Sequence, residues 1–159
     1  GFFLIIFTDY NIVIYNLERV EKSMGMGFGK FTGSIAGIGT EYDLAKKVEI
    51  DLGFAPRTAR FLASVSYVNI QCSNLQPADK PSEITICISE DAQGDEIIVT
   101  STTSILQHGL TTDNKGSAAY KVSCILTLDK ADNVYLHVKT DKGTLEINQV
   151  IITWEDKRN

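Results

Sequence analysis

The sequence predicts an all-β fold, an antiparallel β-sandwich of the jelly-roll kind with about eight or nine strands. Two observations predict it. Short segments in which apolar and polar residues alternate recur along the chain, with turn-forming residues between them. A helical spacing of apolar residues is almost absent. A chain of 159 residues is long enough for one domain with a sizeable core, so we expect a single sandwich.

The sandwich domain is predicted at residues 40–159, and residues 1–39 are expected to form an N-terminal arm or extra strands. Residues 25–39 hold six of the twelve glycines, which favours conformational freedom or close backbone packing, with a short strand at Phe28–Ile35. The apolar run at residues 2–7 is too short to span a bilayer, so no membrane partner is expected. Left bare, it would promote aggregation, and we expect it to be covered by a neighbouring subunit or added to a sheet edge. The interface residues predicted there are Phe2, Phe3, Leu4, Ile5, Ile6 and Phe7.

The clearest strands alternate cleanly between apolar and polar side chains. Val48, Ile50 and Leu52 alternate with charged residues, which is typical of a half-buried strand. The apolar phase of the last strand shifts near Gln149, which predicts a β-bulge or cover on both faces. The other strands are expected at Phe61–Cys72, Glu83–Ser89, Glu96–Thr100, Ser104–Gln107, Ala119–Leu128, Val134–Lys139 and Leu145–Trp154.

Charge and cysteine content exclude several classes of protein. The formal net charge is −5, and the interior basic cluster is only Lys46-Lys47, so nucleic acid is not an expected partner. Three cysteines cannot all pair within one chain, and their long spacing does not fit a structural zinc site. Alternation places Cys72 and Cys124 in the core and Cys87 on the opposite, more exposed face. Free thiols favour assembly in a reducing cytoplasm.

The sequence contains no recognisable catalytic or cofactor motif. Gly29-Lys30 is followed by Phe31, and the leading glycine of a phosphate loop is missing. His108 is interpreted as a turn residue and His137 as a solvent-facing strand residue. No serine-nucleophile elbow or paired-histidine metal motif occurs. We therefore expect no enzyme activity, no catalytic residues, no cofactor and no metal.

Two groups of side chains have a binding interpretation beside a structural one. The acidic loops at residues 90–95 and 129–133 could hold calcium, but Asp and Asn are also the usual residues of turns. Four aromatic residues could form a platform for sugars, although aromatics on strands usually pack against their neighbours. These four are Tyr67, Tyr120, Tyr135 and Trp154, the last of which is expected in the core or at an interface.

Two stretches resemble segments of a known family. Val48–Arg57, followed by Ala59–Ser64, resembles a segment of bacteriophage virion sandwich modules, in which a strand runs into Gly-Phe-x-Pro-Lys/Arg and then a second apolar strand. Ile151–Glu155 resembles the closing strand of the same modules and of H-type lectins.

The resemblance implies a non-enzymatic viral structural protein, such as a capsid cement or decoration protein or a tail-fibre module. Such a protein would dock on major capsid or tail proteins and self-associate, with a trimer implied. It would be located in the virion, after assembly in the host cytoplasm. The alternative is a lectin-like, carbohydrate-binding module of a fibre with a glycan as its partner.

Overall fold

The structure, a computed structural model, describes residues 25–52, 61–76, 78–107, 114–128 and 133–156. Within these ranges it contains nine strands and a short 3₁₀ helix, η1. With three residues, η1 is the one helix of the described ranges, and it is not long enough to cross a membrane. The elements in chain order are β1 (Met26–Ile38), η1 (Leu44–Lys46), β2 (Val48–Asp51), β3 (Phe61–Ser73), β4 (Glu83–Ser89), β5 (Ile97–Ser104), β6 (Leu106–Gln107), β7 (Gly116–Leu128), β8 (Asn133–Thr140) and β9 (Leu145–Asp156).

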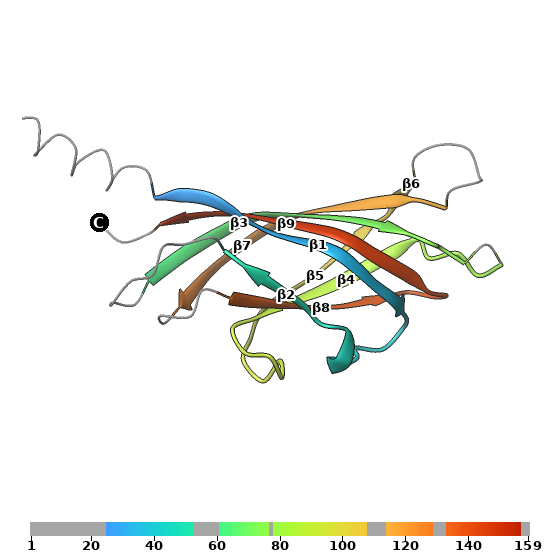
Figure 1. The fold of residues 1–159 in the computed structure, drawn as a ribbon, viewed down its shortest axis with the longest axis horizontal. Helices are drawn as coiled ribbons and strands as arrows, with labels where there is room; N and C mark the ends of the chain where they lie inside the picture. Colours follow the sequence, from blue (N-terminus) through green and yellow to red (C-terminus); the bar gives the residue numbers. More distant parts are fainter. Residues whose placement is uncertain (1–24, 53–60, 77, 108–113, 129–132, 157–159) are drawn as a thin grey trace, which may run out of the picture.

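The strands form two layers that face each other across the core (Figure 1). The β1 layer has the order β1-β9-β3-β7-β6, and the β2 layer has the order β2-β8-β4-β5. All pairs are antiparallel, and the sheet passes from one layer to the other where Lys30 of β1 meets Asp51 of β2. On the opposite side of the sandwich, β5 comes into contact with β7. This interleaved order of eight strands, with the two-residue β6 at one edge, is a jelly roll, which confirms the predicted fold class.

The core follows from the alternation visible in the sequence. Along β7, every second residue from Gly116 to Leu128 is buried. β2 and β4 likewise turn their alternating valine and isoleucine side chains inward. Cys72 and Cys124 are buried in this core, as predicted. Removing these apolar side chains from water is the main stabilising contribution, at roughly 25 cal/mol per Å² of apolar surface.

The bulge predicted in the last strand is confirmed. Gln71 of β3 pairs with Gln149, but the next residue, Cys72, pairs with Ile147. Asn148 is therefore the extra residue of β9, and it shifts the alternation so that Ile147 and Val150 both face the core.

Two hydrogen bonds from aromatic side chains join the layers. The indole Nε1 of Trp154 in β9 donates to the carbonyl oxygen of Leu52 at 3.0 Å, just beyond the end of β2. The hydroxyl of Tyr120 in β7 donates to the carbonyl oxygen of Ile84 in β4 at 2.7 Å. Both side chains are buried, so each polar atom requires a hydrogen-bond partner, and these carbonyl oxygens provide it.

Glycines in β1 allow a close approach at the corner beside Trp154. A Cβ atom on Gly27 would lie 2.7 Å from Cζ2 of Trp154. On Gly29 it would lie 2.7 Å from Cδ2 of Leu52 and 3.0 Å from the carbonyl oxygen of Asp51. Close backbone packing, one of the two explanations offered by the sequence, therefore accounts for these two glycines.

Two predictions in the β2 layer are wrong. Cys87 and His137 are cross-strand neighbours on the face turned away from the core, as alternation predicts. Their exposed fractions are nevertheless only 2% and 4%. The turn at residues 90–95 lies over this face, and a Cβ on Gly94 would be 3.2 Å from Nε2 of His137. Alternation identifies the face of a residue but not the loop that covers it.

We predict that Gly29→Ala destabilises the protein by about 1–3 kcal/mol, because the added methyl group overpacks the corner between Leu52 and the backbone of Asp51. Urea denaturation followed by tryptophan fluorescence measures the change. Gly39→Ala is the matched control, since its Cβ would meet no atom within 4 Å. Equal unfolding free energies for the two variants would contradict the role of Gly29.

Candidate functional site

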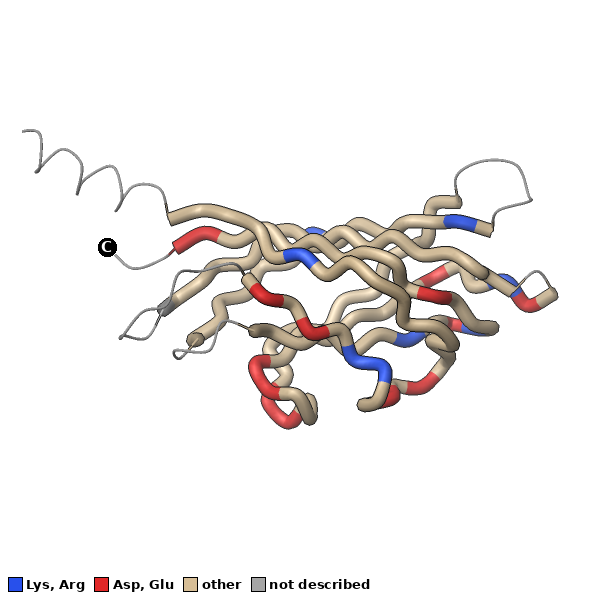
Figure 2. The backbone as a smooth tube through the Cα atoms, viewed as in Figure 1, with Lys and Arg blue, Asp and Glu red and all other residues tan. Residues whose placement is uncertain are grey.

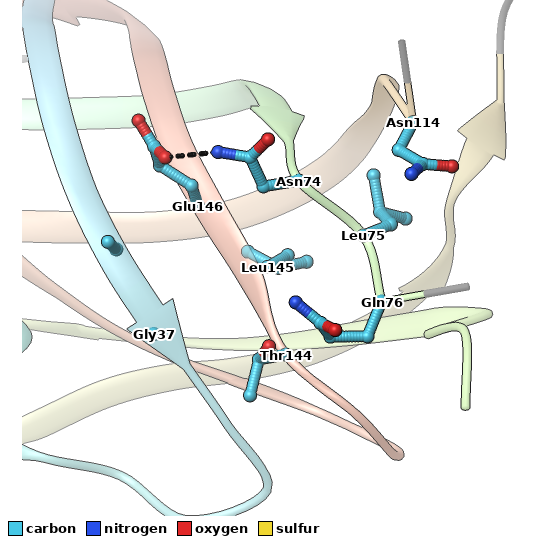
Figure 3. A pocket seen from close by; sticks show the side chains of 9 residues that line it. Gly37, Asn74, Leu75, Gln76, Asn114, Thr144, Leu145 and Glu146 are labelled. Carbon is cyan, nitrogen blue, oxygen red and sulfur yellow. Dashed lines mark hydrogen bonds between the residues drawn. The ribbon is translucent and has the colours of Figure 1, made fainter. Parts of the chain in front are cut away.

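The candidate site is a polar pocket at one end of the sandwich, with a volume of about 410 Å³. It lies where the ends of β1 and β3 and the start of β9 meet the segment before β7 (Figure 3). This volume falls within the range of small-ligand sites, roughly 300–1,000 Å³. The described residues that line the pocket are Ala36, Gly37, Asn74, Leu75, Gln76, Asn114, Thr144, Leu145 and Glu146.

Glu146 is held in place by three hydrogen-bond donors. Asn74 donates from Nδ2 to Oε1 at 2.6 Å, and the hydroxyl of Ser34 donates to Oε2. Asn148, the bulge residue, donates from Nδ2 to Oε2 at 3.3 Å. The hydrogen bonds from Ser34 and Asn74 hold the pKa of Glu146 below its usual value, so the side chain stays ionised. A carboxylate has about four acceptor positions, so a ligand hydroxyl can still bind.

Backbone contacts fix the loops that carry the amide side chains. The amide N–H of Leu75 donates to the carbonyl oxygen of Asn114, and that of Gln76 donates to the carbonyl oxygen of Thr144. Asn74 and Asn114 both have positive φ angles, 54° and 44°. Asparagine is enriched in this left-handed region, where most side chains are disfavoured. The loop positions are therefore set before any ligand binds.

Polar side chains form the rim of the pocket, over two buried leucines. Leu75 and Leu145 are buried, and in Figure 3 they lie between the polar side chains of Asn74, Gln76 and Asn114. Among the described residues, the lining contains no lysine, arginine or aromatic side chain. The rim therefore offers amide donors and acceptors and one carboxylate, with no positive charge.

A second hollow of about 520 Å³ lies against η1, but Lys46 and Asp43 in its lining bind each other and the backbone. The ammonium of Lys46 donates to the carbonyl oxygen of Gly37 at 2.8 Å. It also lies 3.9 Å from Oδ2 of Asp43. We therefore place the candidate site at the Asn74–Glu146 end.

Each of the three cysteines has a raised pKa. Burial raises the pKa of the Cys72 and Cys124 thiols to about 11, which keeps them protonated at neutral pH. Burial raises the pKa of Cys87 too, and the Asp91 carboxylate adds to this effect. Within the described ranges, no group of three potential metal-binding side chains converges.

The acidic loop at residues 90–95 has a structural explanation. Oδ1 of Asp91 accepts hydrogen bonds from the hydroxyl of Ser89 at 2.8 Å and from the N–H of Asp95 at 2.9 Å. Its Oδ2 accepts from the N–H of Glu96 at 3.2 Å. Asp91 thus organises the turn over Cys87 and His137. Residues 129–132 of the other acidic loop lie outside the described residues.

The binding residues considered from the sequence lie in separate places. Phe2, Phe3, Leu4, Ile5, Ile6, Phe7 and His108 are outside the described residues, so the interface prediction stays a prediction. Of the four aromatics, Tyr120 and Trp154 are buried, and Tyr135 is half-buried in the β2 layer. Tyr67 is exposed, on the β1 layer. The four therefore do not form one platform.

Sequence reasoning missed the pocket itself. The segments at residues 74–82, 111–117 and 141–143 fall between the predicted strands, but no pattern in them indicated a shared site. Asn74 and Asn114 belong to two of these segments and are ordinary turn residues, so only the strand order could have brought them together with Glu146.

Comparison with known proteins gives structural similarity alone. No protein-family model and no curated protein matches the chain. A CocE/NonD family hydrolase from Staphylococcus aureus is 11% identical with a TM-score of 0.50, over 81% of this chain and 36% of that one. A carbohydrate-binding module of a family 9 glycoside hydrolase from Ruminococcus flavefaciens is 13% identical with a TM-score of 0.47, over 81% and 99% of the two chains. A carbohydrate-binding module of a Cellvibrio mixtus lichenase, in complex with cellotriose, is 11% identical with a TM-score of 0.37, over 86% and 89%.

At these low sequence identities the similarity concerns the fold alone. This chain matches 36% of the hydrolase, so the hydrolase is almost three times as long as the matched part. The comparisons provide no link to bacteriophage virion modules. That resemblance, with its capsid or tail partners and its virion location, stays a prediction.

Protonation of His137 is expected to destabilise the fold. Burial lowers the pKa of this imidazole, and its Nε2, under the turn at Gly94, has no hydrogen-bond partner among the residues that the structure describes. The Asp91 carboxylate opposes this effect, and the Lys47 ammonium adds to it. As pH falls, the unfolded chain binds the proton near the ordinary histidine pKa of about 6.5, whereas the folded chain binds it only at a lower pH. The folded state therefore loses stability as pH falls below about 6.5.

We predict that His137→Phe loses less stability than the parent chain when the pH is lowered from about 7.5 to about 5.5, a range around the unperturbed histidine pKa. The variant keeps a planar ring at this position but cannot titrate. Urea denaturation at both pH values gives the two differences. A loss as large in the variant as in the parent would show that another group causes the acid sensitivity.

Proposed function

We propose that this chain is a non-enzymatic binding module that holds a neutral carbohydrate in the pocket at the Asn74–Glu146 end. The observation that carries the proposal is the pocket's lining, in which three amide side chains and one ionised carboxylate surround two buried leucines. The residues and their contacts, rather than any relative, support the ligand class.

The lining matches the chemistry of sugar hydroxyls. A hydroxyl both donates and accepts hydrogen bonds, and so does an amide side chain, whereas a carboxylate only accepts. Neighbouring hydroxyls of a sugar ring can therefore bind Asn74 and Glu146 together, because these two side chains are already held 2.6 Å apart by a hydrogen bond.

Charged ligands fit the described lining less well. Phosphate and carboxylate ligands need positive groups, and they would be repelled by the carboxylate of Glu146. Calcium prefers several oxygen ligands with more than one carboxylate, whereas both oxygens of Glu146 already accept hydrogen bonds from Asn74 and Ser34. A neutral polyhydroxylated ligand has neither difficulty. A role in a virion is compatible with this activity but rests on the sequence resemblance.

We predict that the full chain binds a defined glycan and that Asn74→Gly and Asn114→Gly each weaken binding about tenfold, the effect of one lost hydrogen bond worth about 1.4 kcal/mol. Glycine adopts the positive φ of both positions without strain, so the backbone of the pocket is retained while the amide is removed. A glycan array identifies the ligand, and isothermal titration calorimetry measures the affinities.

Asn69→Ala is the matched control, because Asn69 lies within β3 and is not part of the pocket lining. Its affinity should equal that of the parent. The proposal fails if no glycan binds, or if the two pocket variants bind the array ligand as tightly as the parent chain.

A further inference from the structure

The outer face of the β1 layer carries a cluster of exposed apolar side chains at one end of its strands. We call this cluster the apolar patch. Its members come from β1, β3 and β7, and they have exposed fractions between 37% and 68%. Exposed apolar side chains that gather on one face of a soluble protein mark interaction sites. The patch consists of Met26, Phe28, Leu62, Tyr67 and Ile125.

Strand register places four of the five patch residues in two adjacent rows across the β1 layer, and Leu62 lies two residues before Ser64 on β3. In the first row, Met26 pairs with Glu155, Glu155 with Ser64, and Ser64 with Ile125. In the second row, Phe28 pairs with Thr153, Thr153 with Tyr67, and Tyr67 with Lys121. Each row thus runs β1-β9-β3-β7, with the apolar or aromatic groups spread over its width. Figure 2 shows that the tube of this layer is mostly uncharged along these strands.

We propose that the apolar patch is the contact surface for a second copy of this chain, in a twofold-symmetric dimer whose β1 layers pack face to face. A twofold axis parallel to the strands, between β9 and β3, exchanges β1 with β7 of the second copy and β9 with β3. The same residues then meet in both directions, as an isologous interface requires.

This symmetry makes each row complementary to itself. Met26 faces Ile125 of the second copy, so apolar side chains meet apolar ones. Phe28 faces Lys121 of the second copy, which pairs an aromatic ring with a cation, a favourable contact. Thr153 faces Tyr67 of the second copy. The match comes from the register of the strands, and the axis creates no contact between like charges in the two rows.

The size of the face also fits a dimer. Strands of 12 or 13 residues form β1, β9, β3 and β7. At about 3.3 Å per residue and about 4.8 Å between strands, the face measures about 43 Å by 19 Å, or about 800 Å². A standard stable interface buries about 800 Å² on each partner. Packed sheets lie about 10 Å apart with their strands nearly aligned, as this axis requires.

The test is the mass of the full chain in solution, measured by sedimentation velocity and light scattering over a wide range of concentration. We expect a dimer that dissociates on dilution, and we expect Ile125→Asp to raise the dimer dissociation constant at least about tenfold. Lys121→Gln, which removes the cation facing Phe28, should weaken the dimer less. Circular dichroism and urea denaturation confirm that each variant is folded, since these side chains are exposed.

Ile97→Asp is the matched control. Ile97 has the same side chain and nearly the same exposed fraction as Ile125, 53% against 54%, but it lies on β5 in the β2 layer. The dimer of the Ile97→Asp variant should be as stable as the dimer of the parent chain. A monomeric parent, a trimer, or equal effects of the two isoleucine variants would each overturn the proposal. So would an unchanged dimer in Ile125→Asp combined with loss of glycan binding, since that result would assign the patch to a glycan.

Discussion

The hydrogen bond from Trp154 to the carbonyl oxygen of Leu52 is the contact on which the arrangement of the two layers depends. It joins the last strand of the β1 layer to the end of β2, at the corner where the sheet passes from one layer to the other. The corner can close only because Gly27 and Gly29 have no side chains, since a Cβ on either would lie 2.7 Å from Trp154 or Leu52. A bulky aromatic anchor and two glycines therefore act as one unit, although more than 120 residues separate them in the sequence.

The hydrogen bond from Tyr120 in β7 to Ile84 in β4 acts on the other side of the sandwich, where β7 meets β5. With both sides joined, β1, β3 and β9 run side by side through the β1 layer. Their ends therefore gather Gly37, Asn74 and Glu146 around one pocket. The bulge at Asn148 contributes directly, because the extra residue donates a hydrogen bond to Glu146. The packing that stabilises the core thus also positions the polar groups of the site.

The fold could be predicted from the sequence because strand alternation is a local signal. β4 begins and ends at the predicted residues, and the shifted phase of β9 correctly indicated a bulge. The features that were missed depend on contacts between distant segments. His137 looked exposed because nothing in its own strand reveals that Gly94 lies over it. In the same way, Asn74 and Asn114 look like ordinary turn residues until the strand order places them around one pocket with Glu146.

The pocket and the apolar patch lie at opposite ends of the same strands, and this separation matters for binding. β1 begins at the patch with Met26 and reaches the pocket at Gly37, while β9 runs from Glu146 back to Glu155. A twofold axis parallel to the strands preserves their direction, so the proposed dimer presents both pockets at the same end. If the pockets hold glycans as proposed, the second site then binds at a high effective concentration on any surface with clustered sugars. Such pairing can raise apparent affinity by about 10²–10⁴ without a new contact in either pocket.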